Sequence, residues 1–138
     1  MIGSYILVFY INKDCKIQIG KLGVINFRKG YYLYIGSAFG KLTSLEKRIS
    51  RHLRLAQTRK GPLRWHVDYL LSNKKASLIN SFILKSNSRN ECVIAAKVRN
   101  IADGFIPNYG STDCNLCPSH LYYFNRYPRL LKIIELRF

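Results

Sequence analysis

Three side chains near the end of the chain have the spacing of metal ligands. Cys114, Cys117 and His120 follow the pattern Cys-x-x-Cys-x-x-His. Thiolate and imidazole groups are ligands that zinc prefers, and Asp113 or Cys92 could complete a tetrahedron around the ion. The chain has no second Cys-x-x-Cys pair, however. A tight turn of buried thiols held by Asp113 is therefore the alternative to a zinc site.

A second group of side chains could bind anions. Between residues 47 and 64 basic side chains recur, among them Arg48, Arg51, Arg54, Arg59, Lys60 and Arg64. The whole chain has 23 Lys and Arg against 7 Asp and Glu, a formal net charge of +16 and a pI near 10.0. A field of this sign attracts polyanions, so nucleic acid is the predicted partner. A lysine-rich proteome or a structural ribonucleoprotein component would explain the same composition.

Length and composition limit the class of protein. A chain of 138 residues suits one domain, residues 1–138, and its hydrophobic content of 48% is enough for a core. The apolar runs are far shorter than the roughly 20 residues that span a bilayer, and no basic residue precedes the first run as in a signal peptide. The four unevenly placed cysteines favour free thiols or a metal site over a disulfide framework, so we expect a cytoplasmic location.

The N-terminal part of the chain is rich in strand-forming residues and should build the scaffold. Turn residues at 12–14 and 20–23 separate the apolar or alternating segments, which predicts strands at 4–11, 16–19, 24–27 and 31–35. Four short strands with such short connections indicate an antiparallel meander.

The pattern changes to helical spacing after Thr43 and Ser44, which we expect to cap a helix. Its predicted buried stripe is Leu45, Ile49, Leu53 and Ala56. Arg48 should flank this stripe, whereas Arg51 and Arg54 should point towards solvent. Further helices are predicted at 65–71, 91–100 and 127–138, and further strands at 77–84 and 121–124. The predicted fold is α/β of the α+β type, with a small, mostly antiparallel sheet flanked by helices.

The order of a few residues along these elements is distinctive. Gly3-Ser4-Tyr5 heads the first predicted strand and Tyr34-Ile35-Gly36 ends the fourth, while Arg48 lies on the first helix and Glu91 opens a later one. This order resembles the GIY-YIG nuclease superfamily, which cuts nucleic-acid phosphodiesters with one divalent metal ion. The chain departs from the common pattern by a hairpin's worth of extra sequence at residues 15–27.

The resemblance implies a role for each of these residues. Glu91 would hold one Mg²⁺ or Mn²⁺, which would balance the charge that builds up on the phosphate. Arg48 would donate a forked pair of hydrogen bonds to phosphate oxygens. Tyr34 would orient or deprotonate the attacking water, and Tyr5 would complete the hydrogen bonding of water or phosphate. Gly36, which lacks a Cβ atom, would let a phosphate approach the backbone.

Other parts of the chain are similar to a little-characterised GIY-YIG-like branch that is sometimes fused to endonuclease III-type glycosylases. The similar segments lie at residues 30–38, 48–53, 65–70, 91–92 and 111–121, and span nearly the whole chain. This resemblance implies a GIY-YIG-like fold and a DNA-repair protein as a partner. The residues expected to contact nucleic acid are Gly36, Ser37, Lys41, Arg51, His52, Arg54, Arg64 and His66.

Two classes of function agree with these observations. The first is a metal-dependent endonuclease that cuts structured or damaged DNA, or RNA. The second is a basic module with a GIY-YIG-like fold that binds nucleic acid without cutting it. Catalysis requires Tyr5, Tyr34, Arg48 and Glu91 to converge on one cleft, whereas a binding module would allow Glu91 to turn away from it.

Overall fold

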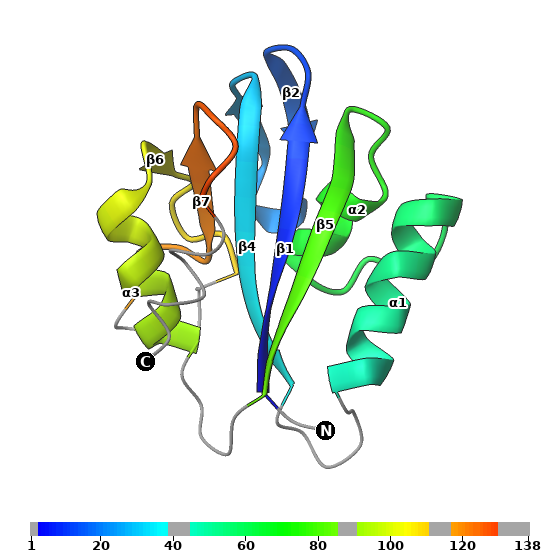
Figure 1. Cartoon of the computed structure of the whole chain (residues 1–138). Coiled ribbons are helices and arrows are strands. Elements are labelled where there is room, and N and C mark those ends of the chain that lie inside the picture. The colour runs from blue at the N-terminus through cyan, green and yellow to red at the C-terminus, as the bar shows by residue number, and fades with distance from the viewer. Residues whose placement is uncertain (1–2, 39–44, 86–90, 111–116, 130–138) are drawn as a thin grey trace.

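The chain folds into an antiparallel sheet with helices on both faces and a separate hairpin (Figure 1). The computed structural model describes residues 3–38, 45–85, 91–110 and 117–129, without the side chains of Lys85 and Glu91. The strands are β1 (Gly3–Ile11), β2 (Cys15–Gln18), β3 (Val24–Phe27), β4 (Gly30–Ala38), β5 (Ala76–Lys85), β6 (Gly104–Phe105) and β7 (Leu121–Phe124). The helices are α1 (Leu45–Thr58), α2 (His66–Leu71), α3 (Glu91–Ile101) and the short 3-10 helix η1 (Gly20–Leu22). The expected α+β class is confirmed.

The strands pair differently from a simple meander. The main sheet has the order β5-β1-β4-β7-β6, and β2 pairs only with β3 in a two-stranded sheet. β1 and β4 have nine residues each and are each flanked by strands on both edges. They are therefore buried along almost their whole length. β2 and β3 have four residues each and alternate exposed with more buried positions, so they form the hairpin inserted between the two long strands. The extra sequence at 15–27 is this hairpin.

The two faces of the sheet bury separate cores. Tyr5, Leu7 and Phe9 of β1 point to the face covered by α1, α2 and the hairpin. Ile6 and Val8 point to the opposite face, where Ile94, Ala95 and Val98 of α3 cover them. This alternation is the two-residue period of a strand covered on both sides. It places Tyr5 on the face that α1 covers and the body of α3 on the other face.

Helix α1 buries a stripe that differs from the predicted one at two positions. Leu45, Ile49, His52 and Leu55 are buried, whereas Leu53 is 39% exposed. Seven residues make nearly two complete turns, so His52 lies almost directly below Leu45, and Leu53 lies about 100° further round. The prediction of Leu53 in the stripe was wrong because it followed hydrophobicity and passed over a buried histidine.

Several expected features fall on residues outside the described ranges. They are the helix cap at Thr43 and Ser44 and most of the C-terminal helix at 127–138; the described part of that segment, 127–129, has no regular structure. Within the described ranges no helix is both long and apolar enough to cross a membrane.

Candidate active site

A small pocket forms where β1 and β4 meet α1 and the start of α2. It has a volume of about 150 Å³. Six of the residues predicted to act on or bind nucleic acid line it together, namely Tyr5, Tyr34, Gly36, Ser37, Arg48 and His52. Trp65, Val67, Gly110 and His120 complete the lining. Residues that are far apart in the sequence are therefore brought together around a space large enough for a phosphate group.

Tyr5 and Gly36 are direct partners across the β1–β4 pair. A Cβ atom on Gly36 would lie 2.3 Å from Cζ and 2.5 Å from the hydroxyl oxygen of Tyr5. No real Cβ atom approaches another heavy atom so closely, so the Tyr5 ring lies across the backbone of Gly36 only because that residue is glycine. Gly36 was expected to let a phosphate approach the backbone, and its packing against the Tyr5 ring is a further reason for a glycine at this position.

His52 forms a hydrogen bond with the hydroxyl of Tyr5. The Tyr5 hydroxyl oxygen lies 2.8 Å from His52 Nε2, and both side chains are buried. Burial lowers the pKa of His52 to about 4, an effect that the nearby Asp68 carboxylate only partly offsets. His52 is therefore neutral at neutral pH, and when Nδ1 carries its proton the Tyr5 hydroxyl donates to Nε2. Nδ1 itself is buried and makes no hydrogen bond to the described residues.

Arg48 is held at the pocket by contacts with Ser37 and Trp65. Its Nη1 atom donates to the backbone carbonyl of Ser37 at 2.6 Å, and its guanidinium carbon lies 4.9 Å from the centre of the Trp65 ring. A guanidinium stacked on an indole and bound to a carbonyl has a fixed orientation. The expectation that Arg48 flanks the buried stripe of α1 is confirmed by its half-buried position.

Tyr34 closes the pocket together with a loop from the second half of the chain. Its ring centre lies 6.3 Å from those of both Tyr5 and Tyr109, and Gly110 packs against its edge. Gly110 has φ +69°, and its N–H donates to Nδ1 of His66 at 2.8 Å. His66 is thus an anchor for this loop and does not line the pocket itself.

Arg51 turns to Asp68 rather than to solvent. Its guanidinium donates to both carboxylate oxygens at 2.9 and 3.1 Å, and Asp68 is fully buried. Asp68 also accepts from the backbone N–H groups of Arg64 and Trp65. The pair joins α1 to the start of α2, and the Arg51 guanidinium also lies 4.8 Å from the Trp65 ring centre. The prediction that Arg51 points to solvent was wrong because a buried carboxylate seventeen residues away cannot be read from helical spacing.

Trp65 lines the small pocket but was not among the residues expected to form the site. Its ring is contacted by both Arg48 and Arg51 and lies edge-on to His52, with the two ring centres 6.4 Å apart. It is the chain's single tryptophan and directly precedes α2. An isolated tryptophan just after a run of arginines is the signal that could have identified it.

A second pocket, with a volume of about 380 Å³, is basic. Its lining includes Arg51, Arg54, Lys60 and Arg64, so the predicted contacts Arg54 and Arg64 gather in one place. The lining also contains Leu55, Gly61 and Pro62, and no carboxylate. Arg51 lines this basic pocket and stacks on Trp65, which lines the small pocket, so the two pockets are neighbours.

Two predicted site residues cannot be placed in full. Lys41 lies outside the described residues, as does the side chain of Glu91, whose backbone begins α3. Magnesium requires oxygen ligands, usually with at least one carboxylate. The described lining of the small pocket offers tyrosine hydroxyls and no carboxylate, so a metal there would depend on Glu91. Cys92, the next residue, lies 3.9 Å from His120 in the pocket lining, measured from Sγ to Nε2, so the start of α3 is close to this site.

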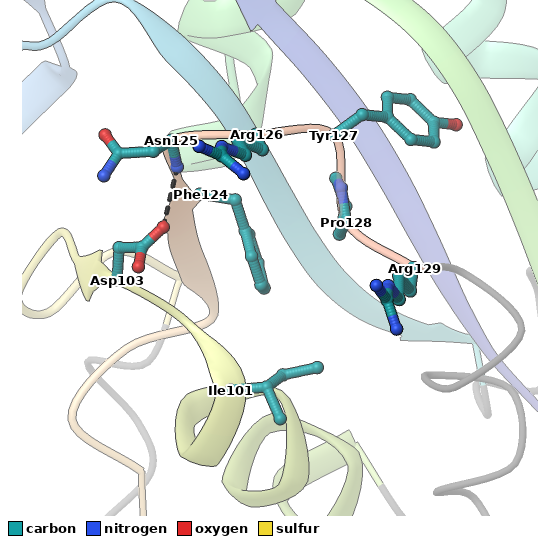
Figure 2. A pocket seen from close by; sticks show the side chains of 8 residues that line it. All are labelled: Ile101, Asp103, Phe124, Asn125, Arg126, Tyr127, Pro128 and Arg129. Carbon is teal, nitrogen blue, oxygen red and sulfur yellow. Dashed lines mark hydrogen bonds between the residues drawn. The ribbon is translucent and has the colours of Figure 1, made fainter.

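Another pocket lies between the end of α3 and the turn after β7 (Figure 2). Its volume is about 390 Å³, and Asp103 fixes the turn by accepting a hydrogen bond from the N–H of Asn125 at 2.7 Å.

Comparison with known proteins gives a family but no described activity. A family model described as a domain of unknown function, DUF123, matches residues 4–138. No curated protein and no solved structure matches the chain.

Proposed function

We propose a function for this chain, which belongs to the DUF123 family: it is a GIY-YIG-like endonuclease that hydrolyses phosphodiester bonds in nucleic acid. The observation that carries the proposal is the convergence of Tyr5, Tyr34 and Arg48 on one small pocket. These residues come from β1, β4 and α1, and their order along the chain is the order of the GIY-YIG superfamily. The net charge of +16 supports a nucleic-acid substrate.

Arg48 is the proposed phosphate ligand. Its guanidinium is oriented by the Ser37 carbonyl and the Trp65 ring, so little freedom is lost when it binds a phosphate. It would donate to the non-bridging oxygens of the phosphate that enters the pocket. These oxygens gain charge as water attacks, so the contact would stabilise the transition state more than the ground state.

Tyr5 and His52 are the proposed proton acceptors for the attacking water. Because His52 is neutral, its Nε2 can accept the proton of the Tyr5 hydroxyl across their 2.8 Å hydrogen bond. The Tyr5 proton would pass to Nε2 in the same step in which the Tyr5 oxygen takes a proton from the water and the water oxygen bonds to phosphorus, because a histidine with a pKa of about 4 is too weak a base to hold a phenol proton beforehand. The phosphorus bond to the leaving sugar oxygen breaks, and that oxygen takes a proton from solvent. Tyr34, in the same lining, would hold the water in line.

Glu91 is the proposed ligand for Mg²⁺ or Mn²⁺. Bound there, the ion would neutralise charge on the phosphate and on the leaving oxygen. Support for a carboxylate near the pocket comes from Cys92, whose contact with His120 brings the first turn of α3 close.

Substrate and setting are part of the same proposal. The basic pocket of Arg51, Arg54, Lys60 and Arg64 beside the cleft would bind the nucleic-acid backbone next to the cut. We propose structured or damaged DNA as the substrate, RNA as the second choice, and a DNA-repair protein in the cytoplasm as the partner. These choices rest on the resemblance and on composition.

A binding module without catalysis is the second candidate, and one observation favours it. The described lining of the small pocket holds no carboxylate, so the pocket can bind a phosphate without any metal ligand. In that case Glu91 has no role in the function, and the protein holds nucleic acid for a partner enzyme.

A cleavage assay separates the two candidates. The purified protein is incubated with Mg²⁺ or Mn²⁺ and labelled duplex, branched and single-stranded DNA and RNA. We expect cleavage of at least one substrate by wild type, and losses of about 100-fold or more for Arg48→Ala and Glu91→Gln. Lys74→Ala and Glu46→Gln are the matched controls, since both change exposed residues outside the pocket lining. Binding without cleavage by wild type would favour the second candidate.

A further inference from the structure

A cluster of side chains that could bind a metal ion adjoins the small pocket, whose lining includes one of them, His120. Cys92 comes from the first turn of α3, while Cys117 and His120 come from the segment just before β7. One ligand atom from each residue lies within 4.8 Å of the other two, and Cys92 Sγ is 3.9 Å from His120 Nε2. Cys117 and His120 are buried and Cys92 is half-buried.

The surrounding structure fixes these donors. The N–H of His120 donates to the carbonyl of Tyr109 at 2.8 Å, and its carbonyl accepts from the N–H of Ile35 at 2.9 Å. Helix α3 is fixed against the sheet by its buried residues, and Cys117 belongs to the same apolar cluster. Because the two segments are held independently, the three donors meet without any rearrangement of the backbone.

The donor set and its spacing match zinc. Two thiolates and an imidazole are soft and borderline ligands, which favour zinc over magnesium or calcium. Tetrahedral zinc holds such ligand atoms about 3.5–3.8 Å apart, so the observed separations of up to 4.8 Å close by about 1 Å when an ion binds. Rotation of the cysteine side chains is enough for such a movement.

We propose that Cys92, Cys117 and His120 bind a zinc ion that joins the start of α3 to β7. A pocket of about 180 Å³ lies beside Cys92 and Cys117 and is lined also by Arg99, so a fourth ligand has room to reach the ion. The sequence spacing offered a zinc site at Cys114, Cys117 and His120, completed by Asp113 or Cys92, as one of two interpretations beside a turn of buried thiols. Cys114 lies outside the described residues, and the described cluster has Cys92 as the third donor.

The role of the ion is structural. The ligands lie beside the apolar cluster on this face of the sheet, and zinc would cross-link Cys92 to residues 25 and 28 positions further along the chain. The site does not depend on the proposed nuclease function, since its ligands are not the proposed catalytic residues. If that function holds, the ion also fixes the turn that carries Glu91.

Zinc content tests the proposal without any nucleic acid. The full chain is purified under reducing conditions from zinc-supplemented culture and dialysed, and its zinc is measured by mass spectrometry. We expect about one zinc ion per chain in wild type and in Cys15→Ser, the matched control from β2. Cys92→Ser and Cys117→Ser should each bind zinc at least ten times more weakly, and a strong chelator should lower the melting temperature of wild type and Cys15→Ser but not of these two variants.

Cobalt provides a measurement that does not require the variants to fold. Titration of zinc-free wild type with Co²⁺ should produce the intense absorption of cobalt bound to thiolate, and zinc should abolish it. The proposal is overturned if wild type gives no such absorption and holds no zinc after dialysis. It is equally overturned if folded Cys92→Ser and Cys117→Ser keep the zinc affinity of Cys15→Ser.

Discussion

At the scale of single residues, the candidate site depends on the contact between Tyr5 and Gly36. The tyrosine ring occupies the space where any larger residue than glycine would place its Cβ atom. The same ring reaches His52 through its hydroxyl. The absence of a side chain at Gly36 on β4 therefore fixes where the Tyr5 hydroxyl meets His52 of α1. The site is sensitive to changes at Gly36 for this reason.

Gly36→Ala should displace the Tyr5 ring and destabilise the fold. We expect a loss of about 1–3 kcal/mol in the free energy of unfolding, as for other overpacked core positions, together with loss of any cleavage. Urea unfolding of the variant measures the first effect. Gly104→Ala is the control, because a Cβ atom there has no contact closer than 3.7 Å. Equal stability of the two variants would contradict the packing account.

His52 should make the protein sensitive to mild acid. Its pKa is about 4 when folded and about 6.5 when unfolded, so below pH 6.5 the unfolded chain takes up a proton that the folded chain does not. Stability is therefore lost as the pH falls through 6.5 and the loss is complete below 4, at about 3 kcal/mol in total. We expect His52→Gln to have a flatter dependence of unfolding free energy on pH over this range. Parallel curves for the two proteins would refute the assignment.

Some residue roles follow from the sequence and others do not. The order of Tyr5, Tyr34 and Arg48 predicts that they share a site, and they line one pocket. The bond between Tyr5 and His52 could not be predicted, because it joins residues 47 positions apart through the geometry of two elements. Glu91 stays a prediction, since its side chain lies outside the described residues.

At the scale of elements, helices α1 and α2 are joined by a buried carboxylate. Asp68 accepts two hydrogen bonds from Arg51 and two from backbone N–H groups at the start of α2. A buried charge is stable only when it is paired and hydrogen-bonded in this way. The Arg51 guanidinium of this pair also stacks on Trp65. The other arginine on that ring, Arg48, is oriented by the same side chain.

Asp68→Ala should therefore loosen α2 and the site together. The change removes the acceptor of four hydrogen bonds and leaves the charged Arg51 side chain beside an apolar gap. We therefore expect a loss of about 3 kcal/mol in the free energy of unfolding. Asp14→Ala is the matched control, because Asp14 is exposed and accepts a hydrogen bond from the N–H of Lys29. Chemical denaturation measures both variants, and a similar small loss in each would contradict this role of Asp68.

Element positions were more predictable than the contacts between elements. Local patterns were enough for the bounds of α1, α2, α3 and most strands, since apolar spacing and turn residues are local properties. The buried face of α1 was misjudged at Leu53, and the pairing of Arg51 with Asp68 was missed. Both features depend on which other element faces α1. The spacing of residues along one helix carries no information about that element.

At the scale of the whole molecule, the sheet order brings distant parts of the chain to one site. β1 lies between β4 and β5, so a strand from the start of the chain is sandwiched between two later ones. The sequence predicted the strands but not this order, because short connections favoured a meander and the long β1–β4 pairing is non-local. The hairpin between them is an insertion that leaves the Tyr5–Gly36 register intact.

The excess of positive charge should govern binding to nucleic acid. Affinity for duplex DNA should fall steeply as salt rises, because bound phosphates release their counterions. Replacing Arg54 and Arg64 together by alanine should lower the slope of log affinity against log salt by about two, if both contact phosphates. Titrations by fluorescence anisotropy at several salt concentrations measure this slope. The double variant Lys13→Ala, Lys74→Ala, with the same charge change away from the basic pocket, should keep a slope closer to wild type.

The most direct test of the proposed active site is the cleavage rate of Tyr5→Phe under single-turnover conditions with Mg²⁺. This change removes the hydroxyl bound to His52 and keeps the ring that packs on Gly36. We expect a rate at least about 100-fold below wild type, while Tyr10→Phe, the same change further along β1, cuts at the wild-type rate. Cleavage by Tyr5→Phe at the wild-type rate would contradict the proposed active site.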